Sequence, residues 1–288
     1  MADANAEKIR ESVIAGTWYP GNPARLKKEL ALYLDRARPP AVDGDLMGLL
    51  VPHAGYIYSG GVAAWSFKLL LESKFDRVLI LAPSHRTSLS HASIYNLGGY
   101  RTPLGIVPLD HELIDDLYKN AALFRFNPQA DSAEHSLEIQ LPFLQTVLDS
   151  FRLTPVIMGL QHYDFCEQLA QAIDKACRGR RVLIIASSDL SHYYSYEKAV
   201  LLDGVCLERL NCFDPEGLAS DVRNQTTQAC GAGPLITMML AARKLGSDRS
   251  KVLHYANSGD VTGDRSGVVG YAAAAVYRSA SHGQSQKQ

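Results

Sequence analysis

The chain has 288 residues, with 29 basic and 30 acidic side chains and a formal net charge of -1. This balance, without a basic run interleaved with aromatic residues, argues against nucleic-acid binding. The five cysteines form no Cys-x-x-Cys pair, which argues against a secreted disulfide framework or a structural zinc ribbon. No apolar run approaches the roughly 20 residues of a membrane span, and the N-terminus lacks an apolar signal core. We therefore expect a cytoplasmic protein without a membrane partner.

The order of apolar segments predicts an alternation of strands and helices, as in an α/β fold. Helical composition begins around residues 26–34, and the first strand follows at 46–52. The other expected strands are 77–83, 153–158, 181–187, 252–257 and 268–277. The other expected helices are 61–71, 111–118, 132–148, 164–177, 196–210, 215–222 and 233–245. We expect one domain over residues 1–288, with a core from about 15 to 277, a less regular stretch at 87–110 and a disordered tail at 279–288.

Three apolar runs each end in a histidine or an acid where the run becomes polar. The runs are Leu49 to His53, Val78 to His85 and Val182 to His192. Runs of Leu and β-branched residues without alternation are typical of strands buried on both faces of a parallel sheet. Open α/β sheets bind their ligands beyond the carboxyl ends of such strands. We therefore expect three imidazoles and a carboxylate to share one site, namely His53, His85, His192 and Asp189.

His53 and His85 follow the first two expected strands. Two neutral imidazoles at neighbouring strand ends suit a transition-metal site. Taken alone, His53 could equally be a hydrogen-bonded loop histidine, but its match with His85 favours a joint function. Two tyrosines, Tyr56 and Tyr58, follow His53 closely and offer rings and hydroxyls beside the imidazole.

Asp189 and His192 are three residues apart just past an expected buried strand. If the chain is helical there, both side chains lie on one face, and Asp189 could bind a metal or orient His192 as a base. The alternative is a capping aspartate with a bystander histidine. Cys230 directly precedes an expected apolar helix, where a thiolate is favoured, although a lone cysteine is more often a buried, inert thiol.

Glu134 and His135 lie near the start of the expected helix 132–148. The pair does not form a His-Glu-x-x-His zinc-protease helix, because the residue three positions after His135 is Glu138. A capping role for Glu134 is the simpler alternative. The chain also lacks a Gly-x-Gly-x-x-Gly fingerprint, a phosphate-binding Gly-Lys-Ser/Thr loop and a Gly-x-Ser-x-Gly nucleophile elbow.

Six motifs in order resemble those of the Memo family over residues 15 to 277. They are AGTWYP at 15–20, PHAGY at 52–56, APSH at 82–85, EHSLE at 134–138, SSDLSH at 187–192 and CG at 230–231. The resemblance implies a three-layer α/β/α sandwich with a mostly parallel central sheet, similar to the class III extradiol dioxygenases, which are non-haem iron enzymes. It also implies that the metal ligands are His53, His85 and Cys230. Asp189 and His192 would line the same pocket, with His192 as the general base or acid.

One departure from the dioxygenases concerns the third ligand, which here is Cys230 in place of a carboxylate. A thiolate is softer and more easily oxidised, so we expect iron(II) or copper in preference to zinc. We accordingly expect an oxidoreductase that acts on a small molecule held between Trp18, Tyr56 and the metal, with Glu134 and His135 in the same pocket. The main alternative is a module that binds a peptide or phosphorylated ligand without turnover, or an accessory partner of radical-SAM or AMMECR1-type proteins. Zinc-dependent hydrolysis is a third and weaker reading.

Overall fold

The computed structural model describes residues 8–119 and 122–280. The helices in this part of the chain are α1 (Pro23–Arg36), α2 (Tyr56–Lys68), α3 (His111–Tyr118), α4 (Pro128–Ser132), the 3₁₀ helix η1 (Glu138–Gln140), α5 (Leu141–Val147), α6 (Tyr163–Cys177), α7 (Tyr196–Asn211), α8 (Pro215–Arg223), α9 (Ala232–Lys244) and α10 (Ser258–Thr262). The strands are β1 (Ile9–Arg10), β2 (Gly44–Val51), β3 (Arg77–Pro83), β4 (Ala92–Ile94), β5 (Gly99–Thr102), β6 (Gly105–Val107), β7 (Phe124–Arg125), β8 (Arg152–Met158), β9 (Leu183–Ser187), β10 (His192–Tyr194), β11 (Arg249–Asn257) and β12 (Val268–Ser279).

The main sheet of the described chain has nine strands, in the order β10-β12-β2-β9-β3-β8-β4-β7, with β11 beside β12. The four central strands β2, β9, β3 and β8 run parallel to one another. β12 is antiparallel to β2, and β4 is antiparallel to β8. The predicted α/β class is confirmed, and the parallel part of the sheet consists of these four central strands. A smaller sheet pairs β5 with β1 and β6.

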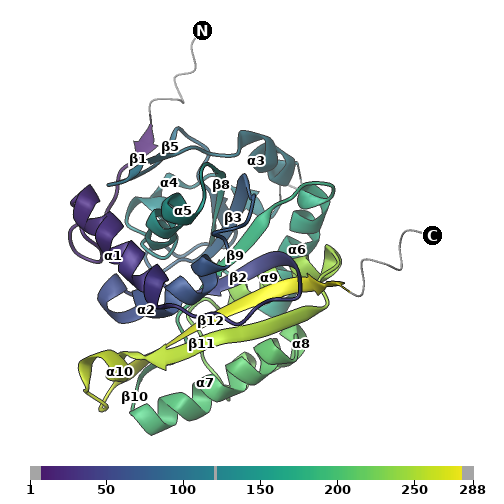
Figure 1. The fold of residues 1–288 in the computed structure, drawn as a ribbon. Coiled ribbons are helices and arrows are strands. Elements are labelled where there is room, and N and C mark those ends of the chain that lie inside the picture. The colour runs from purple at the N-terminus through teal and green to yellow at the C-terminus, as the bar shows by residue number, and fades with distance from the viewer. Residues whose placement is uncertain (1–7, 120–121, 281–288) are drawn as a thin grey trace.

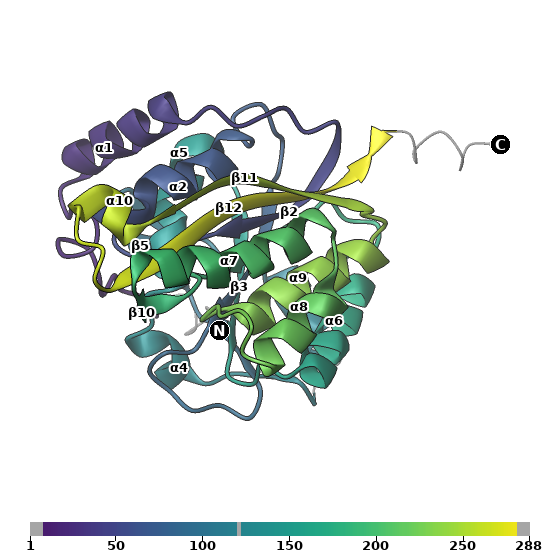
Figure 2. The ribbon, with the colours of Figure 1, turned by 90° about the horizontal axis from the view of Figure 1, so that it is seen from below.

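Helices cover both faces of the main sheet, giving three layers (Figures 1 and 2). α1, α2 and α5 lie on one face, and α6, α7, α8 and α9 lie on the other. α9 is buried along residues 232–242 because it is packed between the strands and the helices α6 and α8. A helix that is apolar all round is expected in such a position.

The predicted continuous helix over residues 132–148 is wrong in its first half, and of residues 133–148 only 138–147 are helical. The chain instead leaves α4 at Ser132, turns through 133–137 and re-enters helical structure as η1 and α5. Two buried carboxylates explain the interruption. Glu134 accepts hydrogen bonds from the backbone N–H groups of His135 and Ser136, and Glu138 binds the N-terminal segment. Pro142 then occupies the first turn of α5, where a missing N–H costs nothing.

The helical turn considered for Asp189 and His192 is also wrong. Residues 188–191 form an irregular segment, and β10 begins at His192. The N–H of Leu190 donates to the carbonyl oxygen of Gly270 over 2.8 Å, and the N–H of Gly270 donates to Ser191 over 2.9 Å. This pairing with β12 brings His192 beside the carboxyl ends of the central strands, and it competes with helix formation for the same backbone groups.

The remaining predicted elements are present with shifted ends. α2 begins at Tyr56 and ends at Lys68, so it starts earlier than the predicted 61–71. The stretch at 87–110 contains the short strands β4, β5 and β6. β12 continues through Ser279, and residues 281–288 of the predicted tail lie outside the described residues. Among the described helices, none combines the length and apolarity needed to cross a bilayer.

Candidate metal centre

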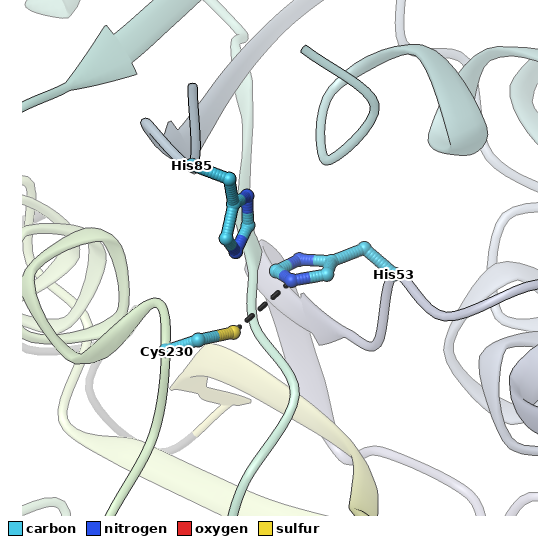
Figure 3. A group of neighbouring side chains, drawn as sticks. All are labelled: His53, His85 and Cys230. Carbon is cyan, nitrogen blue, oxygen red and sulfur yellow. Dashed lines mark hydrogen bonds between the residues drawn. The ribbon is translucent and has the colours of Figure 1, made fainter. Parts of the chain in front are cut away.

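Three donor side chains meet at the carboxyl ends of the central strands (Figure 3). His53 lies two residues after β2, His85 lies two residues after β3, and Cys230 lies in the loop before α9. One ligand atom from each falls within 4.8 Å of the other two, and His53 Nε2 is 3.0 Å from Cys230 Sγ. Metal–nitrogen bonds of about 2.1 Å and metal–sulfur bonds of about 2.3 Å require ligand atoms some 3–4 Å apart. The three residues therefore fit around one transition-metal ion.

Ser187 fixes the tautomer of His53. Its hydroxyl donates its single hydrogen to the carbonyl oxygen of Ser136 over 2.6 Å and accepts a hydrogen bond from Gln140 Nε2 over 2.9 Å. His53 Nδ1 lies 2.9 Å from the same hydroxyl oxygen. Since the hydroxyl hydrogen is already committed, the hydrogen on the imidazole must be at Nδ1. The lone pair of His53 is thus at Nε2, which faces Cys230.

Glu134 fixes the tautomer of His85. Its Oε1 lies 2.9 Å from His85 Nδ1, and its Oε2 accepts the backbone N–H of His85 over 2.6 Å. A carboxylate accepts hydrogen bonds, so Nδ1 carries the hydrogen and Nε2 is left with the lone pair that could bind a metal ion. Figure 3 shows the His85 ring pointing toward His53 and Cys230. Glu134 therefore orients His85. Its side chain is buried, whereas a residue that only capped a helix would be expected at the surface.

The Cys230 loop is pinned against the segment after β9. The N–H of Cys230 donates to the carbonyl oxygen of Asp189 over 3.2 Å, and the N–H of Asp189 points to Cys230 Sγ over 3.3 Å. A Cβ at Gly231 would approach the carbonyl oxygen of Ser187 to 2.3 Å, so glycine is required for this close approach. Burial and the charge of Asp189 raise the pKa of the Cys230 thiol. In the ion-free protein the thiol therefore keeps its proton and donates it toward His53 Nε2, whereas a bound metal would take the thiolate.

Asp189 and His192 flank this cluster. Asp189 Oδ1 accepts the backbone N–H of His53 over 2.7 Å, and Oδ2 is 4.0 Å from His53 Nε2. Burial raises the pKa of Asp189 to about 7, although hydrogen bonds from two backbone N–H groups oppose the shift. His192 Nδ1 donates to the carbonyl oxygen of Leu190 over 2.8 Å, so its Nε2 is free to accept a proton. Burial lowers the pKa of His192.

A cavity of about 840 Å³ opens over the cluster. Its lining includes the predicted site residues Trp18, His53, His85, His135, Asp189 and His192. His135 lies between two of them: it stacks on His85 with ring centroids 4.7 Å apart, and the tilted ring of Trp18 is 4.3 Å away. Burial lowers the pKa of His135 to about 4, so this imidazole is neutral at neutral pH. Its Nδ1 is buried without a hydrogen-bond partner among the described residues.

Tyr56 lies behind the cavity wall. Its side chain is 2% exposed, and its hydroxyl donates to the carbonyl oxygen of Ile139 over 2.7 Å. The neighbouring Tyr58 lines the cavity in its place. Tyr58 takes the place predicted for Tyr56 because α2 begins at Tyr56, and the side chain of this first residue points into the core.

A buried carboxylate holds the segment that carries Trp18. Glu138, itself fully buried, accepts hydrogen bonds from the half-buried Ser12, from the Tyr19 hydroxyl over 2.7 Å and from the guanidinium of Arg10. The carbonyl oxygen of Trp18 accepts the N–H of Tyr56 over 2.9 Å. These contacts clamp residues 10–19 against the cluster and fix the indole over His135.

Several residues that support or line the site were missed by sequence reasoning. They are Gln140, Ser187, Tyr193, Asp264 and Tyr271. The sequence could have indicated Ser187, since this residue belongs to the SSDLSH segment and ends the strand β9. Asp264 and Tyr271 carry no local signal, because α10 and β12 bring them to the cavity from the far end of the chain.

The fold and the site together define a class: an α/β protein with a His-His-Cys cluster at the carboxyl ends of the parallel strands. A family model described as Memo-like protein matches residues 10–275, and the chain belongs to this Memo family.

Similar proteins span nearly the same length. A MEMO1 family protein of Sulfolobus acidocaldarius is 36% identical, covering 91% of this chain and 97% of that protein. Another, MJ0403 of Methanocaldococcus jannaschii, is 37% identical over 93% of this chain and 99% of its own. A solved structure of an uncharacterized protein from Escherichia coli K12 covers 80% of this chain and 99% of its own at 10% identity and a TM-score of 0.44, too low to carry an argument.

Proposed function

We propose that the protein binds one transition-metal ion through His53, His85 and Cys230 and acts as an oxidoreductase on a small molecule held in the cavity. One observation carries the proposal: both imidazoles have their hydrogen held at Nδ1, so that each presents Nε2 toward a shared thiol. Such hydrogen bonding from the outer nitrogen is typical of metal-binding histidines. Donors that served only structure would not need this arrangement.

The donor set favours iron or copper. Imidazole suits zinc, copper and iron alike, whereas a thiolate is a soft ligand that can tune a redox-active ion. Such an ion, once bound, would supply electron transfer to or from the ligand.

The chain's own groups have separate tasks in this scheme. His192 accepts a proton at Nε2, because its Nδ1 is committed to Leu190. Asp189 holds the backbone at His53 through Oδ1 and can exchange a proton at Oδ2, which faces the cluster. Trp18 and His135 form a ring wall against which a planar ligand can pack.

Elemental analysis of anaerobically purified protein tests the proposal. We expect about one iron or copper ion per chain, and a loss of ferrous-iron affinity of at least about 100-fold in Cys230→Ser, since a hydroxyl is a poor substitute for a thiolate. Cys212→Ser is the matched control, because Cys212 is exposed and lies outside the cluster. Cys230→Asp should restore ferrous affinity, since a carboxylate suits that ion. Equal affinity in wild type and Cys230→Ser would contradict the proposal.

A binding module without turnover is the second candidate, favoured by the exposed side chains at the cavity mouth. Tyr193 is 81% exposed and Ile57 is 68% exposed, as expected for a surface that meets a ligand or peptide. Absence of metal from protein that still binds ligands would favour this candidate. A role beside radical-SAM or AMMECR1-type proteins stays a prediction, as do the cytoplasmic location and the relation to extradiol dioxygenases.

A further inference from the structure

The fourth parallel strand, β8, leads to a side chain that contacts the Cys230 loop. β2 and β3 are followed by His53 and His85, and β9 is followed by Asp189. β8 is followed by Gln161, which lies three residues after its last residue. Parallel strands bring such residues to one edge of the sheet. Gln161 precedes α6, and α6 packs against α9, the helix that begins just after Cys230.

The amide of Gln161 makes two hydrogen bonds across the start of α9. Its Nε2 donates to the carbonyl oxygen of Cys230 over 2.9 Å, and its Oε1 accepts the N–H of Gly233 over 2.8 Å. A carbonyl oxygen only accepts and a backbone N–H only donates, so these partners fix the orientation of the amide. A Cβ at Gly233 would lie 2.8 Å from Cβ and Cγ of Gln161, so glycine permits this close approach.

The first turn of α9 depends on this contact. The residue before the helix is Gly231, which has no side chain to cap it, and Pro234 in the first turn has no N–H. The first N–H groups of a helix need partners from outside the helix. Gln161 supplies one to Gly233 from 72 positions away in the chain, as a capping side chain would do locally.

Two groups of contacts hold the Cys230 backbone. Its N–H donates to the carbonyl oxygen of Asp189, and the following N–H donates to the hydroxyl of Ser188 over 2.9 Å. These bonds fix the N–H groups of the loop, whereas Gln161 binds the carbonyl oxygen. Without the Gln161 bond the peptide group after Cys230 is free to rotate. The sulfur then leaves its position 3.0 Å from His53 Nε2.

We propose that Gln161 is a positioning residue that keeps the Cys230 thiol beside the two imidazoles and so decides whether the metal site includes sulfur. The inference rests on the proposed metal binding, and the residue acts only through another. Outer contacts of this kind change metal affinity by about 10- to 100-fold. Both hydrogen bonds of the Gln161 amide go to the cysteine side of the site, so its loss removes the sulfur and leaves the two imidazole nitrogens in place.

Gln161→Met and Gln161→Glu in the full chain test the proposal. Methionine keeps the length of the side chain and removes both hydrogen bonds. Glutamate keeps the acceptor for Gly233 but places a carboxylate oxygen, which cannot donate, against the carbonyl oxygen of Cys230. Gln171→Met, at an exposed position in α6, is the matched control.

Metal binding is measured with Cd²⁺, which favours thiolate, with Mn²⁺, which favours harder ligands, and with Co²⁺, whose absorption spectrum reports a bound sulfur. We expect both Gln161 variants to bind Cd²⁺ about 10- to 100-fold more weakly than wild type and to lose the sulfur-to-cobalt charge-transfer band. Mn²⁺ affinity should change by no more than about threefold, because the imidazoles stay in place. Gln171→Met should match wild type with all three ions.

A second measurement needs no metal. A Cys212→Ser background removes the exposed thiol, and Cys166, Cys177 and Cys206 are buried. A disulfide reagent should then modify Cys230 about tenfold faster in both Gln161 variants than in wild type, because the loop opens more often without the amide contact. Mass spectrometry locates the modified cysteine.

An unchanged cobalt band, or an equal loss of affinity for all three ions, would overturn the inference, because Gln161 would then only support the fold. A Gln161→Glu variant that behaves as wild type would also overturn it, since the residue would then only cap α9. A failure of the proposed function is distinguishable from these outcomes. Wild type that binds no ion would lose the oxidoreductase, yet the rate of Cys230 modification would still decide whether Gln161 positions this thiol.

Discussion

Asp131 in α4 and Glu134 just after it are both 2% exposed, yet their surroundings drive their carboxyl groups in opposite directions. Burial raises the pKa of Asp131 to about 7, since one hydrogen bond from Tyr100 and the charge of Arg10 do not offset the loss of water. Burial also acts on Glu134, but hydrogen bonds from the side chain and backbone of His85 and from Ser136 outweigh it and lower the pKa to about 2. Asp131 Oδ2 has no partner among the described residues.

The difference teaches that hydrogen bonds, and not depth, decide which buried carboxyl group stays charged. Glu134 belongs to the centre because a permanently ionised acceptor orients His85. Asp131 only supports the fold, and its protonated form is the one that the interior favours. The following changes would break or sharpen this comparison.

Asp131→Asn should have the largest effect on stability. The folded-state pKa of about 7 lies above the ordinary value of 3.8, so the stabilisation from protonated Asp131 is fully present below about pH 4 and is lost as the pH rises from 4 to 7. The loss amounts to about 4 kcal/mol. The asparagine variant should lack this dependence. Urea unfolding at pH 5 to 8 measures it, with the exposed Asp149→Asn as control. A constant difference between wild type and variant across this range would disprove the assignment.

Glu134→Gln should change the pH dependence of stability at lower pH and with the opposite sign. The folded-state pKa of about 2 lies below the ordinary 4.5, so Glu134 stabilises the fold above about pH 4.5, and this contribution disappears as the pH falls toward 2. We expect the wild type to lose about 3 kcal/mol over that range and the variant to lose little.

The same variant should weaken metal binding by about 10- to 100-fold, because an amide holds the Nδ1 hydrogen of His85 less firmly. Isothermal titration with Zn²⁺ measures this effect. Glu216→Gln, which removes an exposed ion pair with Arg243, is the control. Unchanged metal affinity in Glu134→Gln would remove Glu134 from the centre.

Ser187→Ala should cost about 1–3 kcal/mol of stability, because the Nδ1–H of His53, the carbonyl oxygen of Ser136 and one N–H of Gln140 lose their partner, although Gln140 keeps its bond to Pro52. It also frees the His53 tautomer, so metal affinity should fall, although less than in Glu134→Gln because a neutral acceptor is lost. Ser66→Ala removes another buried hydroxyl, which bonds only the carbonyl oxygen of Leu50 over 2.7 Å. Both variants should lose stability, and only Ser187→Ala should lose affinity.

His192→Ala should have the smallest effect on metal affinity, within about twofold, since its contacts place it beside the ligand set and not in it. Any turnover of a cavity ligand should be lost, because the proton acceptor is removed. His254→Ala, which removes a ring stacked on Trp65, is the control. Metal loss equal to that of His53→Ala would place His192 among the ligands.

Local sequence patterns predicted the central strands and the residues at their ends. β3 spans Arg77–Pro83, as the apolar run indicates, and His53 and His85 follow their strands as expected. Parallel strands bring their carboxyl ends to one edge, so the apolar runs were enough to predict that these imidazoles meet. The expectation that their strands are direct neighbours is wrong, because β9 lies between β2 and β3. Cys230 was different, since its place in the cluster came from family resemblance and not from its own surroundings.

Patterns of the same kind failed where long-range contacts compete with local ones. Helical periodicity at 132–148 could not reveal that Glu134 and Glu138 are drawn to His85 and to the N-terminal segment. Helix formation stabilises this segment less than the hydrogen bonds that its two buried carboxylates accept. Nor could the sequence tell that Tyr56 faces the core while Tyr58 faces the cavity, because this depends on where α2 begins.

The sequence by itself determined the α/β class, the buried strands and the histidines at their ends, because short apolar runs indicate buried strands. The tertiary structure alone decided the imidazole tautomers, the close approach of Cys230 to His53 and the set of residues that line the cavity. These features depend on residues far apart in the chain, such as His53 with Ser187 and Cys230, or His85 with Glu134. These side chains reach their final positions only when the strands have paired and the helices have packed on the sheet.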